Sequence, residues 1–320
     1  MDSITLDGLD LKIAHALKID GRASFTAIGE VLDVSDQTVA RRYQRMRSAG
    51  ALRVVGLLGV VAPGPDRWFV RIRCVPDAAQ SIAEALARRT DTYWIQLAAG
   101  GAEVICVTAP VSQASHEALL LQKLPRTPRI TDINAYQLLR SYEPDPLLFG
   151  ERVDGLTAAQ ADLLRPPPDD LPPTPLTSTD RAIVDVLGRD GRASLAELAA
   201  TTGHPESTVR RRLNALRRNG CLRFDIDMAN DLTGHYAHSI LWLTVEPREL
   251  RAAARAMLTY SEVNFLAAVS GSANLMASVT CRNGAALYDF IADRVGALDG
   301  VRQASTAPVQ RIIKRHGQPW

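Results

Sequence analysis

The chain has 320 residues, of which 46% are hydrophobic, and its formal net charge is only +2. This length allows roughly two to four domains, and the near-neutral charge excludes a chain that is basic throughout. No apolar run approaches the ~18 residues of a membrane span, and residues 1–5 lack the charged and apolar regions of a signal peptide. We therefore expect a cytoplasmic protein without membrane contact.

One segment of the chain occurs twice, so that Leu6 aligns with Leu176 and Arg53 with Arg223. The pentapeptide Asp-Gly-Arg-Ala-Ser at 20–24 returns unchanged at 190–194. From Leu6 to Arg53, 17 of 48 positions are identical to those of the second copy. Because the matches hold one register without a gap, they indicate an internal duplication.

Each copy is expected to form three short helices. In the first copy, apolar residues recur at helical spacing until Gly21, which is predicted to end the helix in the left-handed conformation. Ser24 is placed to cap a second helix and Ser35 a third. In the second copy, His204 stands at the third cap and Pro205 at the first helical position. A short second helix, a turn and a third helix make a helix-turn-helix.

The third helix of each copy is rich in arginine. Residues 35–47 contain four arginines and one acid, and residues 205–218 contain five arginines and one acid. Guanidinium groups pair with phosphate and stay charged, and short polar residues at a helix start suit base edges. A solvated helix face is the alternative, but the pattern in both copies favours DNA binding. The predicted DNA contacts are Ser35, Asp36, Gln37, Thr38, Arg41, Arg42, Arg45, Glu206, Ser207, Thr208, Arg210, Arg211 and Arg212.

A second kind of domain is expected after each helix-turn-helix. Residues 52–58 suggest a wing strand, and a turn-rich hinge follows at 62–65. The elements then follow the order βαββαβ, which is ferredoxin-like. Strands are predicted at 68–75, 92–98, 103–108 and 130–139 and at 236–245, 263–269, 275–281 and 301–313, and helices at 78–89, 112–124, 248–258 and 285–295.

A proline-rich segment separates the two halves. Residues 144–175 contain eight prolines, which favour an extended, semi-rigid spacer, and a short capped helix is expected at 157–164 within it. The predicted domains are a winged helix-turn-helix at 1–62, a βαββαβ domain at 63–143, the linker at 144–175, a second winged helix-turn-helix at 176–232 and a second βαββαβ domain at 233–320.

These features resemble the Lrp/AsnC, or feast/famine, transcriptional regulators. The resemblance is carried by Asp-Gly-Arg-x-Ser, the basic third helix and the Gly-x-Leu-Arg that follows it, and it covers nearly the whole chain in two copies. It implies an α+β fold of two winged helix-turn-helix domains, each followed by a ferredoxin-like βαββαβ effector domain. An ordinary member carries one copy and pairs as a dimer. We therefore expect an intrachain pseudo-dimer, which could self-associate further.

The resemblance also implies a site for an amino acid or a related metabolite. In the family, a Gly-x-x-Asp turn between the second and third strands of the effector domain lies near this site. The matching turns are Gly-Gly-Ala-Glu at 100–103 and Gly-Ser-Ala-Asn at 271–274, and neither keeps the aspartate. A plain β-turn explains the glycines equally well. The expected effector-binding residues are Gly100, Gly101, Glu103, Gly271, Ser272 and Asn274.

No catalytic, metal or cofactor site is expected. The four cysteines, at 74, 106, 221 and 281, form no Cys-x-x-Cys and are expected to be buried thiols. His235 and His238 are three residues apart, and on a strand side chains at that spacing face opposite ways. That geometry argues against a shared metal ion.

Three functions follow from these patterns. The favoured one is a sequence-specific regulator that binds double-stranded DNA in the nucleoid and responds to a small metabolite. An architectural DNA-binding protein would share every DNA-binding feature but would need no effector. Siroheme decarboxylases resemble Lrp/AsnC proteins in both domains and use histidine and arginine around a tetrapyrrole. The six histidines here are scattered and both third helices are basic, which favours a regulator over an enzyme.

Overall fold

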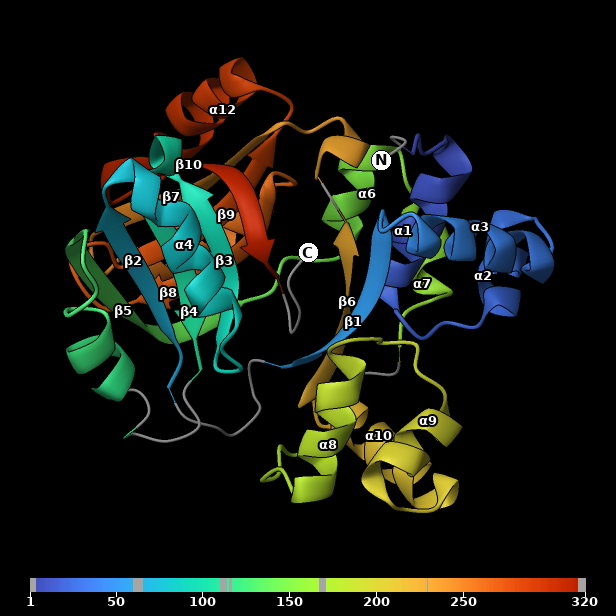
Figure 1. The fold of residues 1–320 in the computed structure, drawn as a ribbon. Helices are drawn as coiled ribbons and strands as arrows, with labels where there is room; N and C mark the ends of the chain where they lie inside the picture. The colour runs from blue at the N-terminus through green and yellow to red at the C-terminus, as the bar shows by residue number, and fades with distance from the viewer. Residues whose placement is uncertain are drawn as a thin grey trace. The chain divides into compact units, whose positions relative to one another are not determined.

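Equivalent segments of the two repeats fold together. The computed structural model describes residues 4–59, 66–109, 114, 117–166, 171–228 and 230–315. One unit combines Met1–Pro63 with Asp145–Gly234, and the other combines Gly64–Pro144 with His235–Trp320 (Figure 1). The predicted hinge at 62–65, the prolines at 167 and 168, and residues 112, 113, 115 and 116 of a predicted helix lie outside the described residues.

The first unit contains both helix-turn-helix segments. The side chains of Ser24 and Ser35 each accept a hydrogen bond from the backbone of the helix that follows, as predicted. The third helix of the second copy begins one residue later than predicted, because Pro205 rather than His204 is its N-cap residue. The elements are α1 (Gly8–Ile19), α2 (Phe25–Leu32), α3 (Asp36–Ser48) and β1 (Leu52–Leu58), and α8 (Ser178–Leu187), α9 (Leu195–Thr202), α10 (Glu206–Arg218) and β6 (Leu222–Met228).

Strands β1 and β6 pair with one another in an antiparallel ribbon. Residues 52–58 lie opposite residues 228–222 in that order. Val55 lies opposite Asp225, which is its own equivalent in the second copy. The β1–β6 ribbon therefore has a local two-fold pseudo-symmetry about this pair. The predicted wing strand of each copy is one half of the ribbon.

The glycine of the repeated pentapeptide is required for close packing. Gly21 does not have a positive φ, so the predicted left-handed turn was wrong. A Cβ on Gly21 would lie 2.7 Å from both Phe224 Cβ and Val54 Cγ1. A Cβ on Gly191 would lie 2.8 Å from Val54 Cγ1, and the Gly191 amide donates to the Val54 carbonyl at 2.8 Å. Each glycine thus lets its loop approach the β1–β6 ribbon closely.

Part of the proline-rich segment is helical and packed, where an extended spacer was predicted. It forms α6 (Leu147–Val153) and α7 (Ala158–Asp162). Thr157 caps α7 with a reciprocal capping box, as expected for the short helix predicted there. Apolar side chains of the segment join the core of the first helix-turn-helix, namely Leu156, Ala161 and Leu164. Burial of these residues accounts for the departure from polyproline geometry.

His15 attaches this segment to α1. Its ring is fully buried, and Nδ1 accepts a hydrogen bond from the Leu156 amide at 2.8 Å. Nε2 lies 3.2 Å from the carbonyl oxygen of Pro146 and donates to it when the ring is neutral. Burial lowers the pKa of His15 below its ordinary value of 6.5. A Cβ on Gly150 or Gly155 would overlap the ring, so both glycines are needed for this packing.

The second unit contains both βαββαβ segments, and the predicted α+β fold is confirmed. Its eight strands form a sheet closed on itself in the order β10-β3-β4-β2-β5-β8-β9-β7. The two segments join where β5 pairs with β8 and where β10 pairs with β3. The strands are β2 (Trp68–Cys74), β3 (Thr92–Ala98), β4 (Glu103–Thr108), β5 (Ile130–Tyr142), β7 (Ala237–Val245), β8 (Val263–Val269), β9 (Leu275–Cys281) and β10 (Val301–Lys314).

Helices cover the outer faces of this closed sheet and side chains fill its interior. The helical elements are α4 (Pro76–Ala87), the π-helix η2 (Ala118–Lys123), α11 (Leu250–Met257), α12 (Gly284–Asp289) and the π-helix η4 (Phe290–Val295). One outer core packs under the helices of each segment. The interior core is shared by both segments and includes Phe69, Ile105, Tyr136, Trp242, Val269 and Met276.

The cysteines are buried, as predicted, and carry no disulfide. Desolvation raises the pKa of Cys106 to about 12, so this thiol is protonated at neutral pH. None of the helices in the described ranges combines the length and the apolar character required to cross a membrane.

Candidate nucleic-acid interface

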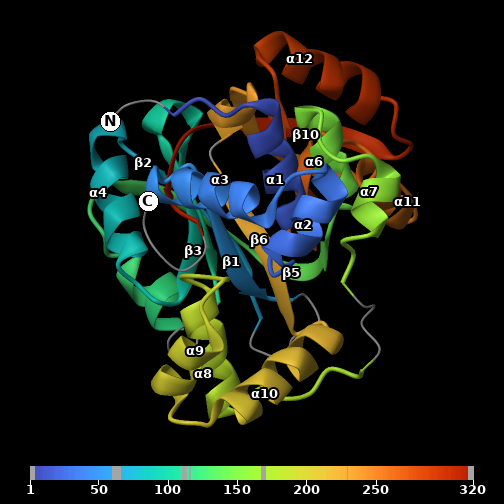
Figure 2. The ribbon, with the colours of Figure 1, turned by 90° about the vertical axis from the view of Figure 1, so that its right-hand side faces the viewer.

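Helices α3 and α10 present their first turns to solvent. Their opposite faces bury Val39 and Tyr43 in one copy and Val209 and Leu213 in the other. Figures 1 and 2 show α3 near one end of the β1–β6 ribbon and α10 near the other. Of the predicted contact residues, the exposed ones in these turns are Ser35, Asp36, Gln37, Glu206 and Ser207, and the half-buried ones are Thr38 and Thr208.

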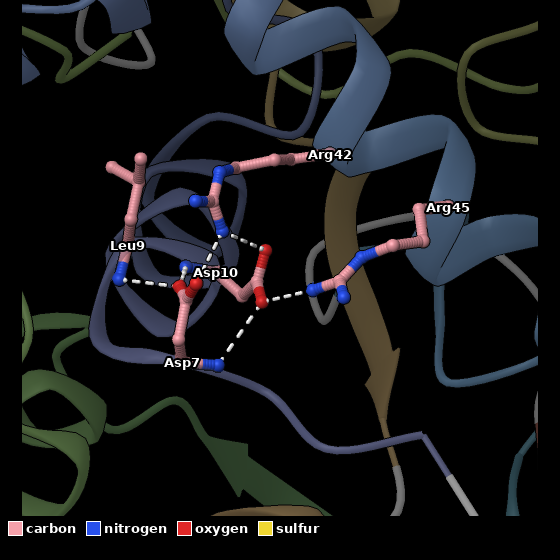
Figure 3. A network of polar contacts seen from close by, with 5 residues as sticks. All are labelled: Asp7, Leu9, Asp10, Arg42 and Arg45. Atoms are coloured by element: carbon pink, nitrogen blue, oxygen red, sulfur yellow. Dashed lines mark hydrogen bonds and ion pairs between the residues drawn. The ribbon is translucent and has the colours of Figure 1, made fainter.

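Two of the predicted contact arginines of α3 bind carboxylates of their own domain (Figure 3). Arg42 Nη1 donates to Asp7 Oδ2 at 2.6 Å and to Asp10 Oδ1 at 3.0 Å, and Arg45 Nη2 donates to Asp10 Oδ2. Asp10 is fully buried and Asp7 caps α1. The hydrogen bond from Arg42 holds the pKa of Asp7 below its ordinary value. These ion pairs tie the third helix to the start of the first.

The second copy repeats these contacts between its third helix and the start of its first helix. Arg212 Nε donates to Asp180 Oδ1 at 2.8 Å, and Arg212 Nη2 donates to Thr177 Oγ1 at 3.2 Å. Asp180 is buried, and Thr177 caps α8. Arg42 and Arg212 are equivalent residues, and both were predicted as DNA contacts. The structure gives both a role inside the domain that the sequence prediction did not include.

The repeated pentapeptides join the two helix-turn-helix segments reciprocally. Arg22 Nη1 donates to two backbone carbonyls of the second pentapeptide, at 2.9 and 3.1 Å. Arg192 Nη1 donates to two carbonyls of the first, at 2.8 and 3.0 Å. Burial lowers the pKa of both guanidinium groups. The Arg192 guanidinium also lies over the ring of Phe25, 4.4 Å from its centroid.

The third helices take part in the same junction. Arg47 Nη2 lies 2.7 Å from Asp190 Oδ2, and Arg217 Nη2 lies 3.0 Å from Asp20 Oδ2. Each ion pair joins the end of one third helix to the pentapeptide of the other copy. The two segments are therefore fixed to each other by pairs of equivalent contacts.

Three of the exposed arginines of the third helices have no described partner. Arg41, Arg210 and Arg211 are exposed. Across the described ranges, none of the three makes a hydrogen bond or ion pair. Arg41 and Arg211 occupy equivalent positions in the two copies. These side chains are free to pair with phosphate, and they lie on the same helices as the exposed first turns.

The two predicted effector turns use their polar residues internally. Glu103 is buried, and its Oε1 accepts from Arg71 Nε at 2.7 Å. The Asn274 amide bonds both backbone groups of Val245, accepting at 2.9 Å and donating at 2.7 Å. Both side chains are therefore engaged in contacts within the second unit.

The glycines of the effector turns have positive φ, which glycine adopts without strain. The φ values are 70° for Gly100, 83° for Gly101 and 101° for Gly271. A Cβ on Gly100 or Gly101 would meet no atom within 4 Å, whereas one on Gly271 would lie 2.9 Å from Tyr136 Cδ1. Ser272 is exposed and its carbonyl accepts from Thr244 Oγ1 at 3.0 Å. The turn geometry alone explains these glycines.

Sequence reasoning missed the acids that hold the third helices. Asp10 and Asp180 are identical in the two copies, and they bind the equivalent arginines Arg42 and Arg212. The acid and the arginine therefore recur together at one spacing, and that shared pair was the available signal. Arg71, which binds Glu103, has no such repeat. When the turns at 100–103 and 271–274 are aligned, the residue equivalent to Arg71 is Trp242. Among the described residues, no group of three or more His, Cys, Asp or Glu is placed to hold a metal ion.

Two family models match the chain. The AsnC-type helix-turn-helix domain matches residues 6–47 and again residues 176–217. The Lrp/AsnC ligand-binding domain matches residues 239–319. The matches fall on α1–α3, on α8–α10 and on the second βαββαβ segment.

Similar proteins include transcriptional regulators of about half this length. An uncharacterised HTH-type transcriptional regulator of Pyrococcus abyssi is 31% identical over 140 residues, which is 43% of this chain and 89% of the relative. The HTH-type transcriptional regulator LrpA of the same organism is 28% identical over 136 residues, 42% of this chain and 96% of the relative.

One solved structure is similar over nearly the full length. The siroheme decarboxylase NirDL superposes with a TM-score of 0.64 at 13% identity, covering 98% of this chain and 94% of NirDL. At this identity the similarity extends to the fold alone.

Proposed function

Because the chain belongs to the Lrp/AsnC family of DNA-binding transcriptional regulators, we propose that one chain supplies both helix-turn-helix domains to a single DNA site. The observation that carries this proposal is the β1–β6 ribbon. Its two-fold pseudo-symmetry relates α3 to α10 as the subunits of a dimer would be related. The reciprocal contacts of Arg22 and Arg192 support the same arrangement.

The proposed DNA contacts are the residues of the two third helices that face solvent. Arg41, Arg210 and Arg211 are exposed and are proposed to bind phosphate, and the exposed first turns are proposed to meet base edges. Arg42, Arg45 and Arg212 position these helices through the acids that they bind. The two first turns differ in sequence, so we propose two unlike half-sites about one helical turn apart or a multiple of it.

In vitro selection of bound sequences tests this function directly. The expected result is a motif of two unlike halves, bound by one chain as judged from the mass of the complex. A strictly palindromic motif bound by a single chain would contradict the proposal. The outcome is informative in either case because each changed base contact shifts discrimination by about 1–3 kcal/mol.

A small metabolite, such as an amino acid, is the proposed effector, bound near the turns at 100–103 and 271–274. The match to a ligand-binding domain supports it. Because Glu103 and Asn274 are engaged internally, backbone groups of these turns are the proposed contacts. A ligand at 100 times its Kd stabilises the folded state by ~2.7 kcal/mol, so a thermal-shift screen of amino acids and related metabolites should detect it. Because Ser272 is exposed, Ser272→Leu should cover the second turn with a larger side chain. This variant should therefore show a smaller thermal shift than the natural chain.

Two other functions are distinguished by simple measurements. An architectural DNA-binding protein would bind DNA but show no shift with any metabolite in the screen. A siroheme decarboxylase would bind siroheme and show its absorbance after purification. We propose that the chain is not an enzyme and acts in the cytoplasm at the nucleoid. Both ring nitrogens of His15 are used within the first unit, so His15 is not free to serve a tetrapyrrole.

A further inference from the structure

The two helix-turn-helix segments differ in charge where DNA would approach. Residues 25–48 contain four arginines and three acids, whereas residues 195–218 contain five arginines and two acids. Two of these differences in charge lie at aligned positions. Ala40 of the first segment aligns with Arg210 of the second, and Glu30 aligns with Ala200. The second segment is therefore more positive before any pairing is considered.

Internal ion pairs widen the difference. In the first segment, Arg42, Arg45 and Arg47 all bind acids of the same unit, which leaves Arg41 as the arginine of α3 without a described partner. In the second segment, Arg210 and Arg211 are adjacent and both exposed. Since paired guanidinium groups are already neutralised, the unpaired ones dominate attraction to phosphate.

The acids of the first segment gather at its helix-helix turn. Glu30, Asp33 and Asp36 are exposed around a shallow surface hollow of about 390 Å³. Their equivalents in the second segment are Ala200, Gly203 and Glu206. A recognition helix enters the major groove by its N-terminal end, close to flanking phosphates. Carboxylates at this turn repel those phosphates over a Debye length of roughly 8–10 Å.

The second segment also has an acid that the first lacks. Glu197 stands where the first segment has Ala27. Its carboxylate accepts from the amide and hydroxyl of Ser194, which caps α9, and these bonds lower the pKa of Glu197. It remains negative at neutral pH, so the second segment has two exposed acids against three. The second segment therefore remains the more positive of the two.

From this asymmetry we infer that the second helix-turn-helix supplies most of the phosphate contacts and anchors the chain on DNA. The first helix-turn-helix contributes mainly base reading, with Asp36 and Gln37 at its leading turn. Carboxylates accept hydrogen bonds from the amino group of cytosine, so acids there favour particular bases even as they weaken general attachment. This inference rests on the proposed DNA-binding function.

Matched substitutions in the two segments test it. The probe is a fluorescein-labelled duplex of mixed sequence, about three helical turns or ~30 base pairs long, followed by anisotropy over a range of KCl concentrations. One variant carries Arg210→Ala with Arg211→Ala, and its counterpart carries Arg41→Ala. A third variant, Glu30→Ala with Ala40→Arg, gives the first segment the residues of the second. Circular dichroism and unfolding temperature show that each variant is folded.

The slope of log affinity against log salt changes by about 0.9 for each phosphate contact. In the variant with both Arg210 and Arg211 replaced, the slope should become shallower by the equivalent of nearly two phosphate contacts. In Arg41→Ala it should become shallower by the equivalent of one contact at most. The third variant should bind more tightly and with a steeper slope than the natural chain. An Arg41→Ala loss as large as that of the double variant, or no gain in the third variant, overturns the inference. Failure of the natural chain to bind any duplex at low salt overturns the proposed function itself.

Discussion

Arg71 and Trp242 occupy equivalent strand positions in the two repeats and stack on each other inside the closed sheet. The Arg71 Cζ lies 4.9 Å from the centroid of the indole. Arg71 lies opposite Ile105 and Trp242 opposite Met276, and these two partners are themselves equivalent in the two repeats. Two identical segments would bring together either two arginines or two tryptophans. Duplication within one chain allowed the pair to become complementary.

The β1–β6 ribbon shows the same divergence. Asp225 lies opposite Val55 at the centre of the ribbon, and its carboxylate accepts from Lys18 Nζ at 2.5 Å. If two chains paired β6 with β6, two copies of Asp225 would lie directly opposite each other, and like charges in that position destabilise a strand pair. The pairing of unlike halves is therefore favoured over the pairing of like halves in both units.

We predict that Arg71 and Trp242 are energetically coupled. Arg71→Ala leaves the buried Glu103 carboxylate without its partner, and Trp242→Ala removes a core aromatic, so each should lower the free energy of unfolding by roughly 3–5 kcal/mol. In a double-mutant cycle measured by denaturant unfolding, the interaction energy should be ~0.5–3 kcal/mol. Trp242→Ala combined with Arg42→Ala is the control, and its effects should add. Additive effects for Arg71 and Trp242 would show that the stacking contributes nothing.

Arg41 and Arg42 are neighbours on α3 and should behave differently. Arg42→Ala removes one of the two arginines that bind the fully buried Asp10, while Arg45 remains, so we expect a loss of roughly 1.5–3 kcal/mol in unfolding free energy. Arg41→Ala changes an exposed side chain and should stay within about 0.5 kcal/mol. Arg212→Ala, at the position equivalent to Arg42, should reproduce the larger loss. Equal stability of the Arg41 and Arg42 variants would mean that the ion pairs of Arg42 do not stabilise the domain.

The helices and strands were predictable from short-range signals. Ser24 and Ser35 bond amides three residues away, and such caps are written in the local sequence. The order βαββαβ followed from alternation and helical periodicity within each segment. Where a local preference had a competitor, prediction was less accurate, as when Pro205 replaced His204 as the N-cap residue of α10.

The contacts that join the two copies were not predictable in this way. Arg47 binds an acid 143 residues away, and Arg217 binds one 197 residues away, so no local pattern indicates either pair. The prolines of the linker predicted an extended spacer, but its apolar residues find a core that only the fold provides. The residues predicted to contact DNA could be placed on their helices from the sequence. Which of these arginines bind acids of their own unit and which stay exposed depends on acids far away in the chain.

Stability of the first unit should fall as the pH drops below about 6.5, because of His15. Burial lowers the pKa of His15 in the folded state, so the unfolded chain binds this proton first. Stability is therefore full above the unfolded pKa and is lost as pH falls from 6.5 towards the folded value. Protonation also removes the acceptor for the Leu156 amide. Urea unfolding between pH 7.5 and 5 measures the change, and His15→Gln should give a shallower pH dependence. An unchanged slope in that variant would assign the effect to other groups.

Gly21 of the repeated pentapeptide is required for close packing and not for a left-handed turn. If Gly21 were needed for a left-handed turn, Gly21→Ala would strain the backbone of the loop alone. With an ordinary φ, the added Cβ instead meets Phe224 and Val54 at 2.7 Å, both on the β1–β6 ribbon. Such overpacking costs typically ~1–3 kcal/mol, and it should loosen the junction between the two helix-turn-helix segments.

Amide hydrogen exchange separates the two explanations. In Gly21→Ala, exchange should quicken at the backbone pairs of β1 and β6, because the ribbon must move away from the new methyl group. Gly8→Ala is the control, since a Cβ there meets no atom within 4 Å. Gly191→Ala should act like Gly21→Ala, because its Cβ would lie 2.8 Å from Val54 Cγ1. Faster exchange confined to the loop at residues 20–24, with the ribbon unchanged, would show that backbone strain rather than close packing is the reason for glycine at this position.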